Sequence, residues 1–148
     1  MLKKLIPNDA DLLEIAPGPG YLSIELAMSG INRITGLDIS ESFVRIADRN
    51  AKLANLRIDL RQGNASTMPF RENEFTHIIC TSAFKNFSEP LKALEEMHRV
   101  LIPKGIVWLC DMRGDVTYKD IDKYVDDMMK MTGINGLITK LTFKYMLR

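Results

Sequence analysis

The chain has 148 residues, enough for one domain with a core of its own. Its 20 basic and 19 acidic residues nearly cancel, which gives no electrostatic reason to expect nucleic acid or an anionic membrane as a partner. No apolar run approaches the roughly 20 residues of a membrane-spanning helix. We therefore expect residues 1–148 to form a single cytoplasmic domain that does not enter a membrane.

Five short apolar runs predict strands, and apolar residues at helical spacing predict helices between them. The predicted strands are Asp11–Ile15, Arg33–Leu37, Arg57–Arg61, Phe75–Cys80 and Ile106–Asp111. The predicted helices are Tyr21–Ser29, Glu41–Ala54, Pro90–Leu101 and, from a weaker pattern, Tyr118–Met131. This alternation predicts an α/β, Rossmann-like, doubly wound and mostly parallel sheet, with helices on both faces and a shortened C-terminal edge. Ile134–Arg148 fits either a strand or part of a helix.

Local signals refine these elements. Ser40 and Ser88 are predicted N-caps of the helices that follow them. Phe43 and Ile46 are expected on the inner face of the second helix, and Pro103–Gly105 is expected to end the third helix and turn the chain into the last strand. The residues of the third helix that we expect in the core are Leu91, Leu94, Met97, Val100 and Leu101.

The two cysteines, Cys80 and Cys110, lie in strand-like apolar runs. Their spacing is neither that of a zinc site nor that of a redox pair. His77 and His98 form no ligand cluster with them, so we expect two buried, reduced thiols and no metal site.

The most informative stretch joins the first strand to the first helix. The strand contains Glu14 and is followed at once by Ala16-Pro17-Gly18-Pro19-Gly20, after which the helix begins at Tyr21. In an open parallel sheet, such a turn places backbone N–H groups and a helix N-terminus beneath a ligand at the carboxyl end of the strand. This arrangement predicts a site for a nucleotide-like cofactor.

Two further polar residues follow predicted strands. Asp38 ends the second strand 20 residues after Gly18, a spacing that suits a carboxylate bound to ribose hydroxyls. Asn64 follows the third strand, where its amide could meet an adenine edge. Both have simpler interpretations, since Asp38 could cap the next helix and Asn64 could belong to an ordinary turn.

These segments, in this order, resemble the class I S-adenosylmethionine-dependent methyltransferases, and most closely their type 11 or UbiE-like group. The resemblance covers about Asp11 to Asp111. It includes Glu14–Gly20 as the first motif, Leu37–Ser40 as the second and Gly63–Ala65 with Met68–Phe70 as the third. It continues through Asn73–Cys80, Thr81–Phe84 and the helix end Arg99–Gly105.

The resemblance implies methyl transfer from S-adenosylmethionine to a small-molecule acceptor, with S-adenosylhomocysteine as the product. The implied cofactor-binding residues are Glu14, Ala16, Gly18, Gly20, Asp38, Ile39, Asn64, Ala65 and Ser82. Ser82, Phe84, Lys85 and Asn86 would lie nearest the acceptor, and no residue is assigned a catalytic role. The chain departs from the family at Ala16, usually glycine, at Asn64, commonly Asp, and at Lys85, often His.

Other interpretations stay open. Ser23 stands where a dinucleotide fold has its third glycine, which argues against a dehydrogenase. We expect the helical cap that the family places before its first strand to be absent or very short here. The short ends fit a fragment, or a non-catalytic cofactor-binding or subunit-interaction module with the same fold. An exposed C-terminal sheet edge would favour a homodimer.

Overall fold

The computed structural model describes residues 5–111 and Lys123. The chain divides into two compact units, Met1–Asp111 and Met112–Arg148, and the elements below belong to the first. The segment Ile134–Arg148 and, apart from Lys123, the predicted helix Tyr118–Met131 lie outside the described residues. Within the described part of the chain, no helix is long and apolar enough to cross a membrane.

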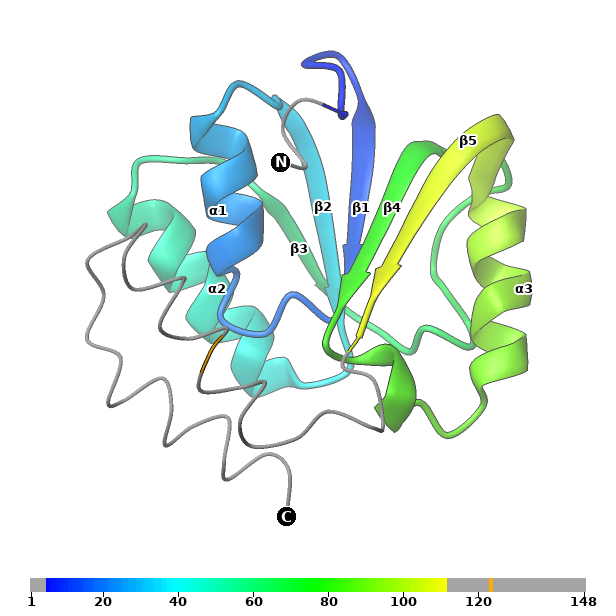
Figure 1. Cartoon of the computed structure of the whole chain (residues 1–148). Coiled ribbons are helices and arrows are strands. Elements are labelled where there is room, and N and C mark those ends of the chain that lie inside the picture. The colour runs from blue at the N-terminus through cyan, green and yellow to red at the C-terminus, as the bar shows by residue number, and fades with distance from the viewer. Residues whose placement is uncertain (1–4, 112–122, 124–148) are drawn as a thin grey trace. The chain divides into compact units, whose positions relative to one another are not determined.

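Strands and helices alternate as predicted (Figure 1). In chain order the elements are β1 (Asp11–Ile15), α1 (Tyr21–Met28), β2 (Arg33–Asp38), α2 (Glu41–Leu53), β3 (Asp59–Gln62), β4 (Phe75–Thr81), the 3-10 helix η2 (Phe84–Asn86), α3 (Pro90–Val100) and β5 (Leu101–Cys110). The five strands form one parallel sheet in the order β3-β2-β1-β4-β5. The predicted fold class is therefore confirmed.

The sheet carries a hydrophobic core on each face. One core joins β1, β2 and β4 to α3 through Met97 and Val100, and the other joins the same strands to α1 through Leu26. Figure 1 shows α1 and α2 on one side of the sheet and α3 on the other. The chain passes from β3 at one edge back to β4 beside β1, so the strand order reverses between β1 and β4. Ligands of open α/β sheets bind beyond the carboxyl ends of the strands at such a reversal.

The connection between α3 and β5 differs from the prediction. The helix ends at Val100 and the strand begins at Leu101, so Pro103–Gly105 lie inside the strand and not in a turn before it. The register between β4 and β5 shifts there, and Lys104 adopts a φ of 68°. The Pro-Lys-Gly sequence thus produces an irregularity within β5, and β5 pairs with β4 both before and after it.

The buried face of α3 was predicted only in part. Met97 and Val100 are buried as expected, but Leu91 is 75% exposed and Leu94 is 39% exposed. Ala93 is buried in their place, so the buried stripe follows positions 93, 97 and 100. This stripe has helical spacing, but it lies about one residue further around the helix axis than the face that carries Leu91 and Leu94.

The inner face of α2 was predicted wrongly. Phe43 and Ile46 are exposed, and the buried residues of this helix are Ala47 and Ala51. A Cβ added at Gly20 would lie 2.9 Å from the Cβ of Ala47, which shows how closely the turn after β1 approaches the helix. Small side chains allow that approach, whereas Phe43 or Ile46 would prevent it.

One of the two predicted helix caps is confirmed. Ser40 is the N-cap of α2 and accepts a hydrogen bond from the backbone N–H of Phe43 at 3.3 Å. The N-cap of α3 is Glu89, with no side-chain cap, so the prediction for Ser88 was wrong by one residue. Pro90 follows at the first helical position, where its missing N–H needs no partner.

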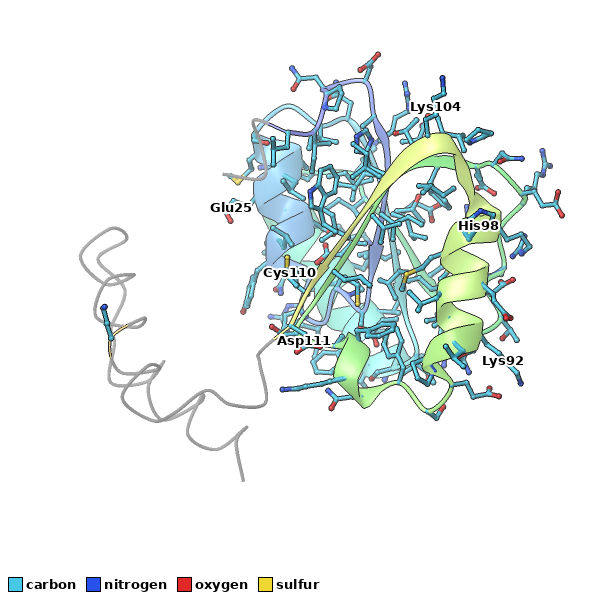
Figure 2. The ribbon with its side chains drawn as sticks, turned by 45° about the vertical axis from the view of Figure 1, so that its right-hand side comes forward. Glu25, Lys92, His98, Lys104, Cys110 and Asp111 are labelled. Atoms are coloured by element: carbon cyan, nitrogen blue, oxygen red, sulfur yellow. The ribbon has the colours of Figure 1, made fainter. Side chains whose placement is uncertain are left out.

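The cysteines also differ from each other. Cys80 is buried, and burial raises the pKa of its thiol to about 12. Cys110 is exposed, contrary to the prediction, because it lies at the end of a strand at the sheet edge (Figure 2).

Candidate functional site

The turn after β1 is built from left-handed backbone. Ala16, Gly18 and Gly20 have φ values of 56°, 54° and 80°. The N–H of Ala16 donates to the carbonyl of Leu37 at 2.8 Å, and the N–H of Gly20 donates to the carbonyl of Pro17 at 2.9 Å. Glycine is required at Gly20 by the approach of α2, whereas a Cβ at Gly18 would meet nothing within 4 Å. Gly18 thus has space for a side chain, although its left-handed backbone would strain any residue other than glycine.

Asp38 ties this turn to the start of α2. Its side chain accepts the N–H of Gly18 at 3.0 Å on one oxygen and the N–H of Ser40 at 2.9 Å on the other. The residue is 5% exposed. Each carboxylate oxygen has a further lone pair, so these bonds leave acceptor capacity for a ligand hydroxyl. Ile39, beside it, is 69% exposed and presents an apolar side chain at the same edge.

Glu14 lies beneath the turn. It is 2% exposed, and the hydroxyl of fully buried Ser23 in α1 donates to its Oε2 atom. Burial raises the pKa of Glu14, the hydrogen bonds from Ser23 oppose that rise, and the charge of Asp38 adds to it. Sequence reasoning noted Ser23 only as a missing glycine. A hydroxyl in the first turn of the helix, nine residues after a buried acid, was the available signal.

The segment after β3 forms a compact turn. The N–H of Gly63 donates to the carbonyl of Asp38 at 2.9 Å, which joins this segment to the second strand. The Oδ1 atom of Asn64 accepts the N–H of Ser66 at 2.9 Å, and the carbonyl of Asn64 accepts the N–H of Thr67 at 3.0 Å. The amide of Asn64 therefore has a local structural role, and its oxygen keeps a second lone pair.

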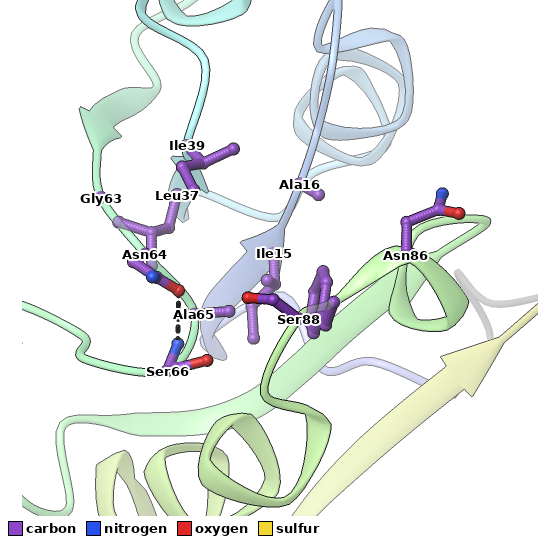
Figure 3. A pocket seen from close by; sticks show the side chains of 11 residues that line it. Ile15, Ala16, Leu37, Ile39, Gly63, Asn64, Ala65, Ser66, Asn86 and Ser88 are labelled. Atoms are coloured by element: carbon purple, nitrogen blue, oxygen red, sulfur yellow. Dashed lines mark hydrogen bonds between the residues drawn. The ribbon is translucent and has the colours of Figure 1, made fainter.

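A pocket opens where these segments meet (Figure 3). It is lined by Ile15, Ala16, Leu37, Ile39, Gly63, Asn64, Ala65, Ser66, Asn86, Phe87 and Ser88. The structure thus brings together four of the predicted cofactor-binding residues, Ala16, Ile39, Asn64 and Ala65. Apolar walls with the amides of Asn64 and Asn86 beside them suit a flat heteroaromatic base, which gains from burial on its faces and from hydrogen bonds at its edge.

The other predicted residues do not line this pocket. Glu14 and Asp38 are buried and support the turn, and Gly18 and Gly20 form the turn itself. Ser82 is exposed at the end of β4, where its backbone N–H donates to the carbonyl of Cys110 at 2.7 Å.

The loop after β4 contributes a wall that sequence reasoning missed. Phe87 and Ser88 line the pocket together with Asn86, which was expected near the acceptor. Asp111 at the end of β5 holds this loop, because its Oδ2 atom accepts the N–H of Lys85 at 3.0 Å. The Nζ atom of Lys85 lies 3.9 Å from the other oxygen of Asp111. No motif in the sequence marked Phe87, and Ser88 was marked only as a helix cap, because η2 determines where both lie.

No group of three or more His, Cys, Asp or Glu side chains that could hold a metal ion occurs among residues 5–111 and Lys123. The polar groups described above are backbone amides, carboxylates, serine hydroxyls, the ammonium of Lys85 and the amides of Asn64 and Asn86. These groups recognise hydroxyl, amine and heterocyclic groups.

Known proteins resemble this chain in sequence and in fold. The family described as "Methyltransferase domain" matches residues 13–109. A demethylmenaquinone methyltransferase of Desulfitobacterium hafniense is 37% identical over 105 residues, which are 68% of this chain and 42% of that protein. The chain therefore spans less than half the length of this curated relative.

Two solved structures have the same fold. The [4+2]-cyclase SpnF superimposes with a TM-score of 0.69 at 28% identity, covering 73% of this chain and 43% of that one. A SAM-dependent methyltransferase from Aquifex aeolicus has a TM-score of 0.73 at 20% identity, covering 90% and 77%, and shows likeness of fold alone. With its match over residues 13–109, this chain belongs to the class I S-adenosylmethionine-dependent methyltransferase family, in the type 11, UbiE-like group.

Proposed function

We propose that this chain binds S-adenosylmethionine and transfers its methyl group to a small-molecule acceptor, releasing S-adenosylhomocysteine. The observation that carries the proposal is the meeting of four loops, those after β1, β2, β3 and β4, around one pocket at the carboxyl edge of the sheet. Membership of the methyltransferase family gives that pocket its expected ligand.

The residues that line the pocket would hold the adenine. Ile39 would cover one face of the ring, and Asn64 with Ala65 would meet its edge. Ala16 would bound the space between the adenine and the methionine part. Asp38 would hold the ribose through the lone pairs that Gly18 and Ser40 leave free.

Glu14, Gly18 and Gly20 would shape the turn around the amino acid part of the cofactor. The carboxyl group of Glu14 is buried directly before that turn and bonds to Ser23 in the helix that follows it. Ser82 would lie beside the methionine part of the cofactor, with Phe84, Lys85 and Asn86 on the loop nearest the acceptor.

The chemistry asks little of the protein beyond alignment. The cofactor supplies a methyl group on a sulfonium, an activated centre that a nucleophile attacks in line. The protein contributes mainly by holding donor and acceptor close together and aligned. A general base is needed only where the acceptor must lose a proton, so we assign none.

The acceptor is a small molecule in this proposal, and the relative from D. hafniense makes demethylmenaquinone one compound to assay. SpnF shows that the fold also supports other chemistry, because that protein is a [4+2]-cyclase. Turnover is therefore the decisive property. A non-catalytic module would bind the cofactor and never release S-adenosylhomocysteine with any acceptor.

The first experiment is calorimetric titration of the purified chain with S-adenosylhomocysteine, with NAD as the control ligand. Micromolar binding of S-adenosylhomocysteine alone supports the proposal, and transfer of a radiolabelled methyl group to candidate acceptors then tests turnover. A preference for NAD, or binding of neither ligand, contradicts it.

The cellular setting and assembly belong to the same proposal. We expect a cytoplasmic protein. Its near-neutral formal charge of +1 gives no reason to expect a nucleic-acid partner. β5 lies at the edge of the described sheet and exposes Ile106 and Leu109. Such an edge favours pairing with a second copy, so we expect a homodimer. Light scattering in solution tests this, and a monomeric mass contradicts it.

A further inference from the structure

The third loop of the pocket is held from α3. Ser66, which lines the pocket, donates its hydroxyl to the carbonyl of Glu89 at 3.2 Å. Further along the loop, the N–H of Met68 donates to Oε2 of Glu96 at 2.6 Å. The segment from residue 64 to residue 70 therefore does not depend on the sheet alone for its position.

Arg99 completes this attachment. Its Nε donates to Oε1 of Glu96 at 2.6 Å and its Nη2 to Oε2 at 2.7 Å, so the two side chains form a two-pronged ion pair. The same guanidinium donates to the carbonyl of Phe70 at 2.9 Å and to that of Met68 at 3.1 Å. One planar group thus joins a carboxylate to two backbone carbonyls, which the single ammonium of lysine cannot reproduce.

The pair is partly shielded from water. The side chains of Arg99 and Glu96 are 31% and 19% exposed, whereas other helix pairs, such as Lys92 with Glu89, are much more open. Met68 and Phe70 are buried in the core beneath the loop. Neither charged residue lines the pocket, so their effect on a ligand would pass through the loop.

We propose that Glu96 and Arg99 are positioning residues for cofactor binding. They fix residues 64–70, and so hold Asn64 and Ala65 in place before the ligand arrives. A loop ordered in advance costs less free energy to bind than one that must be ordered by the ligand. This inference rests on the proposed function, because it assigns Asn64 and Ala65 to the adenine.

The test compares three substitutions at the pair with one matched control. Arg99→Met removes every bond of the guanidinium, Arg99→Lys keeps only the charge, and Glu96→Gln keeps an acceptor for Met68. The control is Lys92→Met, on an exposed residue of the same helix (Figure 2). Its ion pair is with the side chain of Glu89, whereas the loop contacts only the backbone carbonyl of that residue, through Ser66. Affinity for S-adenosylhomocysteine and amide hydrogen exchange are measured for each variant.

We expect Arg99→Met to weaken S-adenosylhomocysteine binding by about tenfold or more, the effect of losing hydrogen bonds made by a charged group. Arg99→Lys should recover little of that loss and Glu96→Gln more, while Lys92→Met should bind like the unaltered chain. Exchange should rise at residues 64–70 and stay unchanged in β1 and β4, which a general loss of stability would not produce.

Unchanged affinity and unchanged exchange at the loop in the folded Arg99 variants overturn the inference. If Arg99→Met does not fold, Arg99→Lys and Glu96→Gln decide the question by the same two measurements. If the unaltered chain binds no S-adenosylhomocysteine, the proposed function fails. The exchange data still show whether the pair fixes the loop.

Discussion

Ala16 and Gly18 offer a matched test of strain in the cofactor turn. Both have left-handed backbone, with φ values of 56° and 54°, but only Ala16 carries a Cβ. A left-handed conformation costs an L-residue roughly 1–2 kcal/mol. Ala16→Gly relieves this cost, whereas Gly18→Ala introduces it without a clash, because a Cβ at Gly18 meets nothing within 4 Å.

The unfolded chain offsets part of each effect. Glycine gives the unfolded state more conformational freedom than alanine does, which lowers the free energy of unfolding by about 0.4–1 kcal/mol. The net expectation is that Ala16→Gly raises the free energy of unfolding by about 0.5–1 kcal/mol, and that Gly18→Ala lowers it by a similar amount. These changes correspond to melting-temperature shifts of about 1–4 °C in opposite directions.

Urea unfolding and scanning calorimetry measure the stability of both variants. Titration with S-adenosylhomocysteine measures whether the pocket keeps its affinity. Ala16→Gly should not weaken binding, because it only removes a methyl group from the pocket wall. Shifts of the same sign, or a less stable Ala16→Gly variant, would refute the assignment of strain to Ala16.

Three further predictions follow from the same edge of the sheet. Asp38→Ala should weaken S-adenosylhomocysteine binding by roughly 1–3 kcal/mol, the cost of stranding polar groups, and unchanged affinity in a folded variant contradicts the ribose assignment. Glu14→Gln should raise stability to urea at pH 7, because burial raises the pKa of Glu14 and the folded state therefore binds its proton more tightly than the unfolded state. That gain should grow as the pH rises above the ordinary carboxyl value of 4.5 and be absent below it; equal stability at pH 7 contradicts it. Ser40→Ala should lower the free energy of unfolding by about 1 kcal/mol, because it removes the N-cap of α2. Unchanged stability in urea unfolding contradicts this.

The sequence predicted the layout because its signals were local. Apolar runs and the turn after Glu14 located the strands, and Ser40 marked the start of α2. The order of three loops at one sheet edge then predicted that Ala16, Ile39 and Asn64 would share a site, and all three line one pocket.

What the sequence did not predict depends on distances between elements. Phe43 was expected inside because it is apolar, but the close approach of Gly20 leaves room only for Ala47 on that face. Phe87 lines the pocket because η2 brings it there, and Arg99 acts through carbonyls that carry no sequence signal. Hydrophobic periodicity indicates which face of a helix is apolar, and it contains no information about how near the neighbouring chain will lie.

The pocket draws its walls from residues 15 to 88, a stretch that runs from the last residue of β1 through β2, β3 and β4. This pocket exists only where these segments come together, so a ligand that fills it recognises the assembled sheet. A ligand that binds only the native state stabilises it by mass action. At a ligand concentration of 100 times the dissociation constant, the free energy of unfolding rises by about 2.7 kcal/mol. Under the proposed function, cofactor supply would therefore raise the stability of the chain, and thermal melting at graded S-adenosylhomocysteine concentrations would measure that rise.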